Sequence, residues 1–306
     1  MNKITAASLG LATLFALNGC NSADMQTKTI TGKAIDPYLA GATVCLGDDD
    51  QHCLSDEASV TTDNQGNYTL TVSGTHFAES HTIIVGGGHD IETDANFTGS
   101  VVAYHYDGNT TVNVSPLTTF AYAQIKEANA TTHQARHAIE ANLTTLFHCD
   151  VHADVVVEAD HNHTAGLKAS LKLARGAELF DANGTFGFYI FAARKHHAGE
   201  HLDVDALLRA AAEQAENDAN GTGLVDAIED VIDAVNDANG SVHTIAREAH
   251  DAAHNAAHDV HNFVHERVCE LTDTCGADHN QTRQQTRDSN DQNRTRSHNP
   301  QDADRR

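Results

Sequence analysis

Hydrophobic and polar residues alternate along the first third of the chain. Segments in which every second residue is apolar are separated by turn residues and recur roughly every 8–12 positions, a spacing typical of small all-β domains. The predicted strands are 27–35, 42–46, 59–62, 66–73, 82–87, 98–106 and 110–115. We therefore expect an antiparallel β-sandwich domain over residues 27–114.

The period of the pattern becomes helical after residue 115. Apolar residues then recur every three or four positions, and Asp or Asn stands near the segment ends, where it can cap a helix. The predicted helices are 116–128, 133–147, 165–180, 186–197, 203–217, 224–236 and 242–271. The expected fold class is α+β with two domains: the sandwich and then an α-helical bundle within 115–275. Residues 276–306 have almost no apolar side chains, which predicts a disordered tail.

Three segments carry a resemblance to a known family. Gly32–Cys45 looks like the opening of a repeat of large bacterial surface lipoproteins, and Thr61–Leu70 follows its strand pattern T-D-x-x-G-x-Y-x-L. Val114–Thr119 matches the junction of that family into a helical region. These segments resemble the carboxypeptidase-regulatory-like, or prealbumin-like, sandwich. The resemblance implies a module that faces the surface or the cell wall, and it implies no reaction.

Residues 1–20 resemble a bacterial lipoprotein signal. Lys3 supplies the positive start, and the apolar stretch 4–17 is too short to span a membrane. Leu17–Cys20 resembles a lipobox, which implies removal of residues 1–19 as a signal peptide and attachment of acyl chains, palmitate among them, to Cys20. Residues 20–26 would then be a linker. Asn21 in place of aspartate implies the outer membrane, facing the periplasm or the cell surface. The alternatives are an ordinary secretory signal cut nearby and an unprocessed anchor.

A five-residue motif recurs along the whole chain. Ten of the 22 asparagines lie in Asp/Glu-x-Asn-x-Ser/Thr, namely Asn96, Asn109, Asn129, Asn142, Asn162, Asn183, Asn220, Asn239, Asn280 and Asn293. Acids and hydroxyl residues each number 43 in the 306 residues, so chance gives roughly 0.4 matches. The motif resembles the acceptor of bacterial single-subunit oligosaccharyltransferases, in which the upstream carboxylate pairs with an arginine of the transferase. The alternative is acidic turn sequence, which explains Asp-x-Asn but not the hydroxyl residue at a fixed offset.

Charge and cysteines agree with an exported protein. The net charge is −24, and removal of residues 1–19, which hold Lys3 and no acid, makes it −25. Such a charge disfavours nucleic acid and attracts cations. Cys45 with Cys53, and Cys269 with Cys275, are predicted to form short disulfides. Cys149 is then either a buried free thiol or evidence that this pairing is wrong.

Two sets of residues offer metal ligands. Residues 218–229 fit an EF-hand-like Ca²⁺ loop, with oxygen ligands from Asp218, Asn220, Thr222, Asp226 and Glu229. A one-sided histidine stripe on the last predicted helix could hold Zn²⁺, Ni²⁺ or Cu²⁺ through His250, His254, His258, His261 and His265. The alternatives are a capped turn between helices at 218–229 and a stripe that packs or faces solvent.

Catalytic motifs are absent from the sequence. It contains no nucleophile elbow, Walker loop, dinucleotide fingerprint or H-E-x-x-H motif. We therefore expect a non-enzymatic, lipid-anchored glycoprotein of the cell envelope, serving display, adhesion or assembly. Its expected partners are the membrane, an oligosaccharyltransferase, and divalent cations or other envelope proteins. The alternative is an envelope metal-binding protein.

Overall fold

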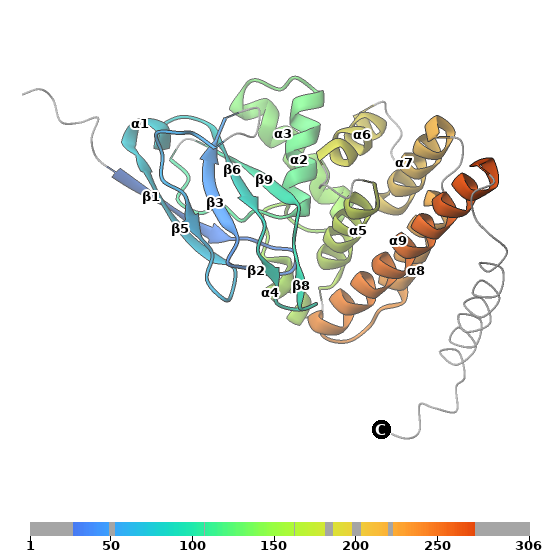
Figure 1. The fold of residues 1–306 in the computed structure, drawn as a ribbon. Helices are drawn as coiled ribbons and strands as arrows, with labels where there is room; N and C mark the ends of the chain where they lie inside the picture. The colour runs from blue at the N-terminus through green and yellow to red at the C-terminus, as the bar shows by residue number, and fades with distance from the viewer. Residues whose placement is uncertain are drawn as a thin grey trace, which may run out of the picture.

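A computed structural model describes residues 27–48, 53–106, 108–161, 163–180, 186–197, 203–219 and 223–272. Its strands are β1 (Thr27–Lys33), β2 (Leu39–Ala40), β3 (Thr43–Gly47), β4 (Val60–Thr61), β5 (Asn67–Ser73), β6 (His81–Gly86), β7 (His89–Asp90), β8 (Ala95–Asn96) and β9 (Ser100–His105). Its helices are α1 (Gly74–Phe77), α2 (Pro116–Glu127), α3 (His133–Phe147), α4 (Val155–Asp160), α5 (Ala165–Phe180), α6 (Phe186–His197), α7 (Val204–Ala219), α8 (Leu224–Asp237) and α9 (Val242–Thr272). Strands therefore precede helices, and the predicted α+β class is confirmed (Figure 1).

The strands form three antiparallel sheets in the described part of the chain. Their orders are β1-β5, β2-β7-β8 and β4-β3-β6-β9. The two-stranded sheet packs on one face of the four-stranded sheet, and Ile30, Leu70, Val44, Ile83 and Val101 are among the apolar residues buried between them. Alternate residues of each strand fill this core because successive side chains point to opposite faces.

Segment 110–115 was predicted to be a strand, but it pairs with its neighbour only through isolated β-bridges. It joins β1 in the parallel direction: the N–H of Val112 donates to Thr31 (2.8 Å) and the N–H of Ile35 donates to Val114 (2.9 Å). Parallel pairing is possible here because residues 34–109 intervene and return the chain to the same end of β1.

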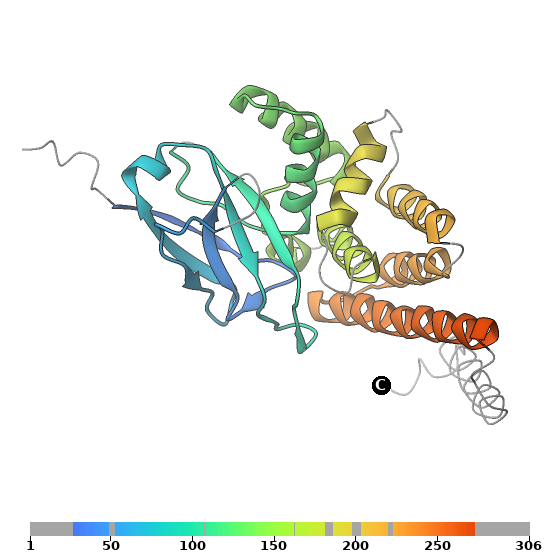
Figure 2. The same cartoon turned by 45° about the horizontal axis from the view of Figure 1, so that its top comes forward.

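Helix α2 covers the other face of the four-stranded sheet. Val102 and Tyr104 of β9 pack against Tyr122 and Ile125 of α2. Figures 1 and 2 show α2 beside β9 and helices α5 to α9 beyond it, on the side away from β1 and β5, whereas the short α1 lies beside β1 and β5. The boundary predicted at residue 114 remains a prediction, because apolar contacts cross it.

The start of α2 explains the predicted junction motif. Ser115 caps the helix by accepting the N–H of Thr118 (3.3 Å), and Thr118 Oγ1 accepts the N–H of Ser115 in return (2.8 Å), with Pro116 at the first helical position. Thr119 Oγ1 also accepts the N–H of Val102 (2.9 Å). The motif therefore begins the helix and attaches it to β9.

The helices share one large core. It takes apolar residues from α2 to α9 and includes Ile35 from the strand half. Helix α8 has the cleanest stripe, with Leu224, Ile228, Val231 and Val235 buried. Within the described residues no helix is both long and apolar enough to cross a membrane.

Candidate functional sites

The glycosylation motifs fall on exposed parts of the fold. Among the ten candidate asparagines, the structure describes Asn96, Asn109, Asn129, Asn142 and Asn239, and all five are exposed. Four of them lie in turns, in loops or at the end of a short strand, and Asn142 alone of the five lies inside a helix. Asn162, Asn183, Asn220, Asn280 and Asn293 lie outside the described residues, as does the predicted lipid site Cys20.

Two of the exposed motifs have defined local geometry. Asn109 Oδ1 accepts the N–H of Thr111 (3.2 Å), which closes a turn that places the amide beside the hydroxyl residue. Asn239 lies between α8 and α9, with Asp237, Asn239 and Ser241 all exposed. Asn239 Nδ2 donates to the carbonyl of Asp237 (2.6 Å), and Asp107, the acid upstream of Asn109, lies outside the described residues.

The motif at Asn142 is presented differently. In a helix, residues two before and two after a given side chain lie together on the opposite face. Glu140 is accordingly buried (6% exposed), where Tyr106 Oη donates to its Oε1 (2.6 Å) and His152 Nε2 lies 3.2 Å away. Burial opposes the charge of Glu140, yet its hydrogen bonds to His152 and Tyr106 lower its pKa. The folded chain therefore exposes the Asn142 amide and withholds its upstream carboxylate.

Helix capping accounts for part of the motif. Ser241 immediately precedes α9, and its Oγ accepts the N–H of Thr244 (3.2 Å). Thr164 likewise stands just before α5. Capping thus explains a hydroxyl residue at 241 without any enzyme, whereas Thr98 and Thr111 precede no helix.

The EF-hand-like loop is only partly described. Helix α7 continues to Ala219 and α8 begins at Leu224, the seventh position of the proposed loop. Asp226 is exposed on α8, and Glu229 is held by Arg209 through two hydrogen bonds (2.6 and 3.0 Å). In this conformation both oxygens of Glu229 bind a guanidinium, so the ligand at the twelfth position of the loop is already paired. The side chains of Asp218, Asn220 and Thr222 are outside the description, and the Ca²⁺ site remains a prediction.

The histidine stripe is described at its first two members. His250 and His254 stack with ring centroids 6.3 Å apart, and His250 is partly buried on α9. Burial and the nearby Arg175 lower the pKa of His250, which favours the neutral imidazole. The described residues contain no group of three or more His, Cys, Asp or Glu side chains placed to hold a metal ion. The side chains of His258, His261 and His265 are not described, and the stripe remains a prediction.

The cysteines are resolved in part. Cys45 and Cys53 form the predicted disulfide, with their sulfur atoms 2.00 Å apart. Cys149 is a buried free thiol, and burial raises its pKa to about 12. The predicted Cys269–Cys275 bridge lies outside the described side chains.

A buried ionic cluster joins the strands to the helices, and sequence analysis missed it. Arg175 of α5 is 3% exposed, and its Nη2 lies 3.4 Å from both Asp36 Oδ1 and Asp90 Oδ2. Its Nη1 pairs with Glu178. Burial raises the pKa of Asp36, and likewise of Asp90, to about 6, against the lowering effect of Arg175. Asp36 and Asp90 are 54 residues apart along the chain, and Asp90 and Arg175 are 85 apart. No local sequence pattern therefore indicates that these three residues meet.

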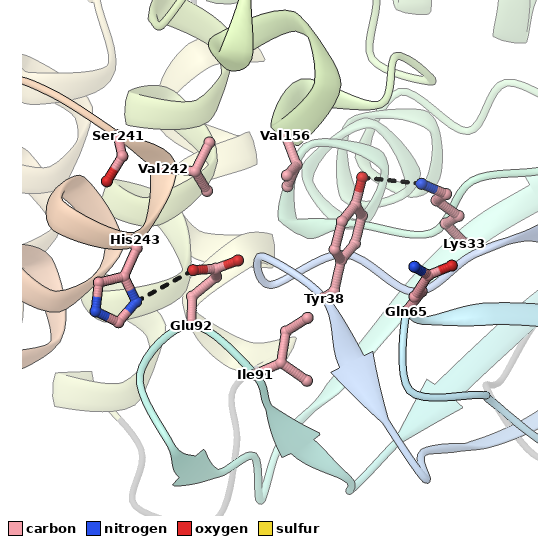
Figure 3. A pocket seen from close by; sticks show the side chains of 9 residues that line it. All are labelled: Lys33, Tyr38, Gln65, Ile91, Glu92, Val156, Ser241, Val242 and His243. Carbon is pink, nitrogen blue, oxygen red and sulfur yellow. Dashed lines mark hydrogen bonds and ion pairs between the residues drawn. The ribbon is translucent and has the colours of Figure 1, made fainter.

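A second polar contact lies beside a cavity of about 470 Å³ between β1, α4 and α9 (Figure 3). Lys33 Nζ donates to Tyr38 Oη (2.9 Å) and pairs with Asp154 (2.8 Å), the residue that caps α4. Across the cavity, His243 Nδ1 lies 3.2 Å from Glu92. Lys33 thus pairs with Asp154 of the α4 cap and His243 of α9 pairs with Glu92, so these contacts fasten the helices to the strand half.

Comparison with known proteins found no matching family model, no matching curated protein and no matching solved structure.

Proposed function

We propose that this chain is a lipid-anchored, multiply N-glycosylated protein of a bacterial cell envelope, without catalytic activity, serving display, adhesion or assembly. The supporting observation is the recurrence of acid, amide and hydroxyl at fixed offsets ten times in 306 residues. The exposure of all five described asparagines is what such a substrate requires. The prealbumin-like sandwich, the helical bundle and their division into two domains belong to the same proposal.

The anchor and the disulfide support export. Cys20 ends a lipobox-like segment, and the Cys45–Cys53 bridge suits an oxidising compartment. An acidic surface with many attached sugars would keep the protein soluble and extended from the membrane. Three of the five described asparagines, Asn96, Asn129 and Asn239, lie at or near the end of a helix or strand.

Whether Asn142 carries sugar would report whether glycosylation follows or precedes folding. A transferase that needs the upstream carboxylate reaches Asp94 and Asp237, which are exposed, but not Glu140, which is bonded to Tyr106. If sugar is added after folding, Asn142 stays bare while Asn96 and Asn239 are occupied. If sugar is added during export, Asn142 is occupied as well.

Removal of single carboxylates tests the proposal. Asp94→Asn and Asp237→Asn keep the size of the side chain and remove its charge, and both positions are exposed, so the fold should tolerate them. In a cell with a single-subunit transferase, glycopeptide mass spectrometry should show occupancy lost at Asn96 in the first variant and at Asn239 in the second. The other sites in each variant serve as internal controls. Unchanged occupancy in both variants, or no sugar on the parent protein, would reject the proposal.

A further inference from the structure

Two histidines on the first turns of α3 bring their ring nitrogens close together. His133 and His137 are four residues apart, so they lie on the same face of the helix. Their Nε2 atoms are 3.2 Å apart and their ring centroids 4.3 Å apart, and both residues are exposed. By contrast, His250 and His254 of the predicted stripe stack with ring centroids 6.3 Å apart. The close approach is therefore a feature of this pair and not of the spacing alone.

The contact between His137 and Glu140 directs the other ring nitrogen of His137 toward His133. His137 Nδ1 lies 3.0 Å from Glu140 Oε2. An ionised carboxylate only accepts, so Nδ1 carries the proton of this contact, and in the neutral imidazole the lone pair is on Nε2. That Nε2 is the atom that faces His133. Metal-binding histidines usually donate their second ring N–H to a carboxylate or carbonyl in this way, because the bond fixes the tautomer and the ring orientation.

The surroundings of the pair hold both rings and the carboxylate in place. The ring of Tyr106 packs edge-on against His133 (centroids 4.7 Å apart) and at a tilt against His137 (4.5 Å). Tyr106 Oη also donates to Glu140 Oε1 (2.6 Å), and His152 Nε2 lies 3.2 Å from the same oxygen. The carboxylate that orients His137 is thus itself fixed by two groups from outside α3.

We propose that His133 and His137 chelate a Zn²⁺ ion through their Nε2 atoms, with water or a dissolved ligand in the remaining positions. With Zn–N bonds of about 2.0–2.1 Å, nitrogen atoms 3.2 Å apart give an N–Zn–N angle of roughly 100–106°, close to the tetrahedral angle that zinc prefers. The ion would lie beside the line between the nitrogens, so each exposed ring has to turn toward it. The described residues offer no group of three metal-ligating side chains, which makes this an open site. Neither donor belongs to a glycosylation motif or to the lipid site.

Modification of histidines by diethyl pyrocarbonate, mapped by peptide mass spectrometry, measures each imidazole separately in the full-length protein. We expect Zn²⁺ to protect His133 and His137 together, with half-protection below about 100 µM. His163, an exposed histidine outside α3, should need at least about tenfold more zinc. Mg²⁺, which prefers oxygen ligands, should protect neither member of the pair.

Removal of one ring should release the other, because chelation needs both. In His133→Asn, protection of His137 should need at least about tenfold more zinc, and His137→Asn should have the same effect on His133. His148→Asn is the matched control. It removes an exposed histidine at the end of the same helix, and asparagine tolerates the left-handed backbone there (φ 56°), so protection of the pair should stay within about twofold.

Three results would overturn the proposal. The first is no protection of the pair at about 1 mM zinc. The second is protection of the pair and of His163 at the same zinc concentration, which would show an adventitious ion only. The third is unchanged protection of each histidine in the folded variant that lacks the other. Circular dichroism shows whether the variants fold, and the first two results need only the parent protein.

Discussion

Replacement of Arg175 by methionine should destabilise the protein strongly at neutral pH. The change removes the guanidinium that lies 3.4 Å from both Asp36 and Asp90, residues that are 2% and 3% exposed. Breaking a buried ion pair by removing one partner costs about 3–5 kcal/mol, because an uncompensated charge stays in the core. Methionine keeps the length and apolar character of the arginine stem, so the loss should come from charge rather than from a cavity.

The loss of unfolding free energy should depend on pH, and the raised pKa values of Asp36 and Asp90 give its direction. Burial raises the pKa of both carboxyls to about 6, above their unfolded value of 3.8, so the folded state binds more protons between these values. The stability that protonation of these carboxyls gives is fully present below about pH 4 and is lost as the pH rises through 6. Without Arg175 their pKa rises further, and the loss extends to higher pH. The difference in unfolding free energy between parent and variant should therefore be larger at pH 7.5 than at pH 5, by about 1–3 kcal/mol.

Urea unfolding followed by circular dichroism at both pH values measures this difference. Arg247→Met, which removes an exposed arginine of α9, is the matched control and should stay within about 0.5 kcal/mol of the parent. Adding Asp36→Asn and Asp90→Asn to Arg175→Met should restore much of the stability, because no buried charge remains. A loss below about 1 kcal/mol at pH 7.5, or equal losses at both pH values, would refute the reasoning.

Three other predictions concern stability and thiol chemistry. Ser115→Ala removes the cap of α2 and should cost about 1–2 kcal/mol in urea unfolding, against less than about 0.5 for the exposed Ser59→Ala; equal effects would contradict the capping role. Replacing Cys45 and Cys53 together by alanine opens a crosslink of sequence separation 8 and should lower the unfolding free energy by about 2–3 kcal/mol; no change would show that the bridge is dispensable. The buried thiol of Cys149, with its pKa raised to about 12, should not react with a thiol reagent at pH 8 until the chain is unfolded, and rapid reaction of native protein would contradict its burial.

The sequence pattern predicted the long elements because burial of one face leaves a strong period. Helix α8 shows this well: its buried residues recur at helical spacing from Leu224 to Val235. The sequence pattern did not predict α4 or the two-residue strands β2, β7 and β8, because these elements are too short to show a period. It also gave no sign that segment 110–115 pairs in parallel with β1, because a period does not identify a partner.

Some of the candidate sites could likewise be predicted from the sequence, and others could not. Motifs with fixed local spacing, such as the ten asparagines and the Cys45–Cys53 pair, are visible in the sequence. The Asp36–Arg175–Asp90 cluster is not, since it depends on three distant segments meeting in the core. Burial of Glu140 was hidden for the same reason, because its partners Tyr106 and His152 come from outside its helix.

The intact mass of native protein, from a cell that has a single-subunit oligosaccharyltransferase, tests the central claim most directly. The account predicts a mass above that of the acylated polypeptide from Cys20 onward by several whole glycan units, with sugar mapped to Asn96, Asn109, Asn129 and Asn239. A mass equal to that of the bare acylated polypeptide would contradict it.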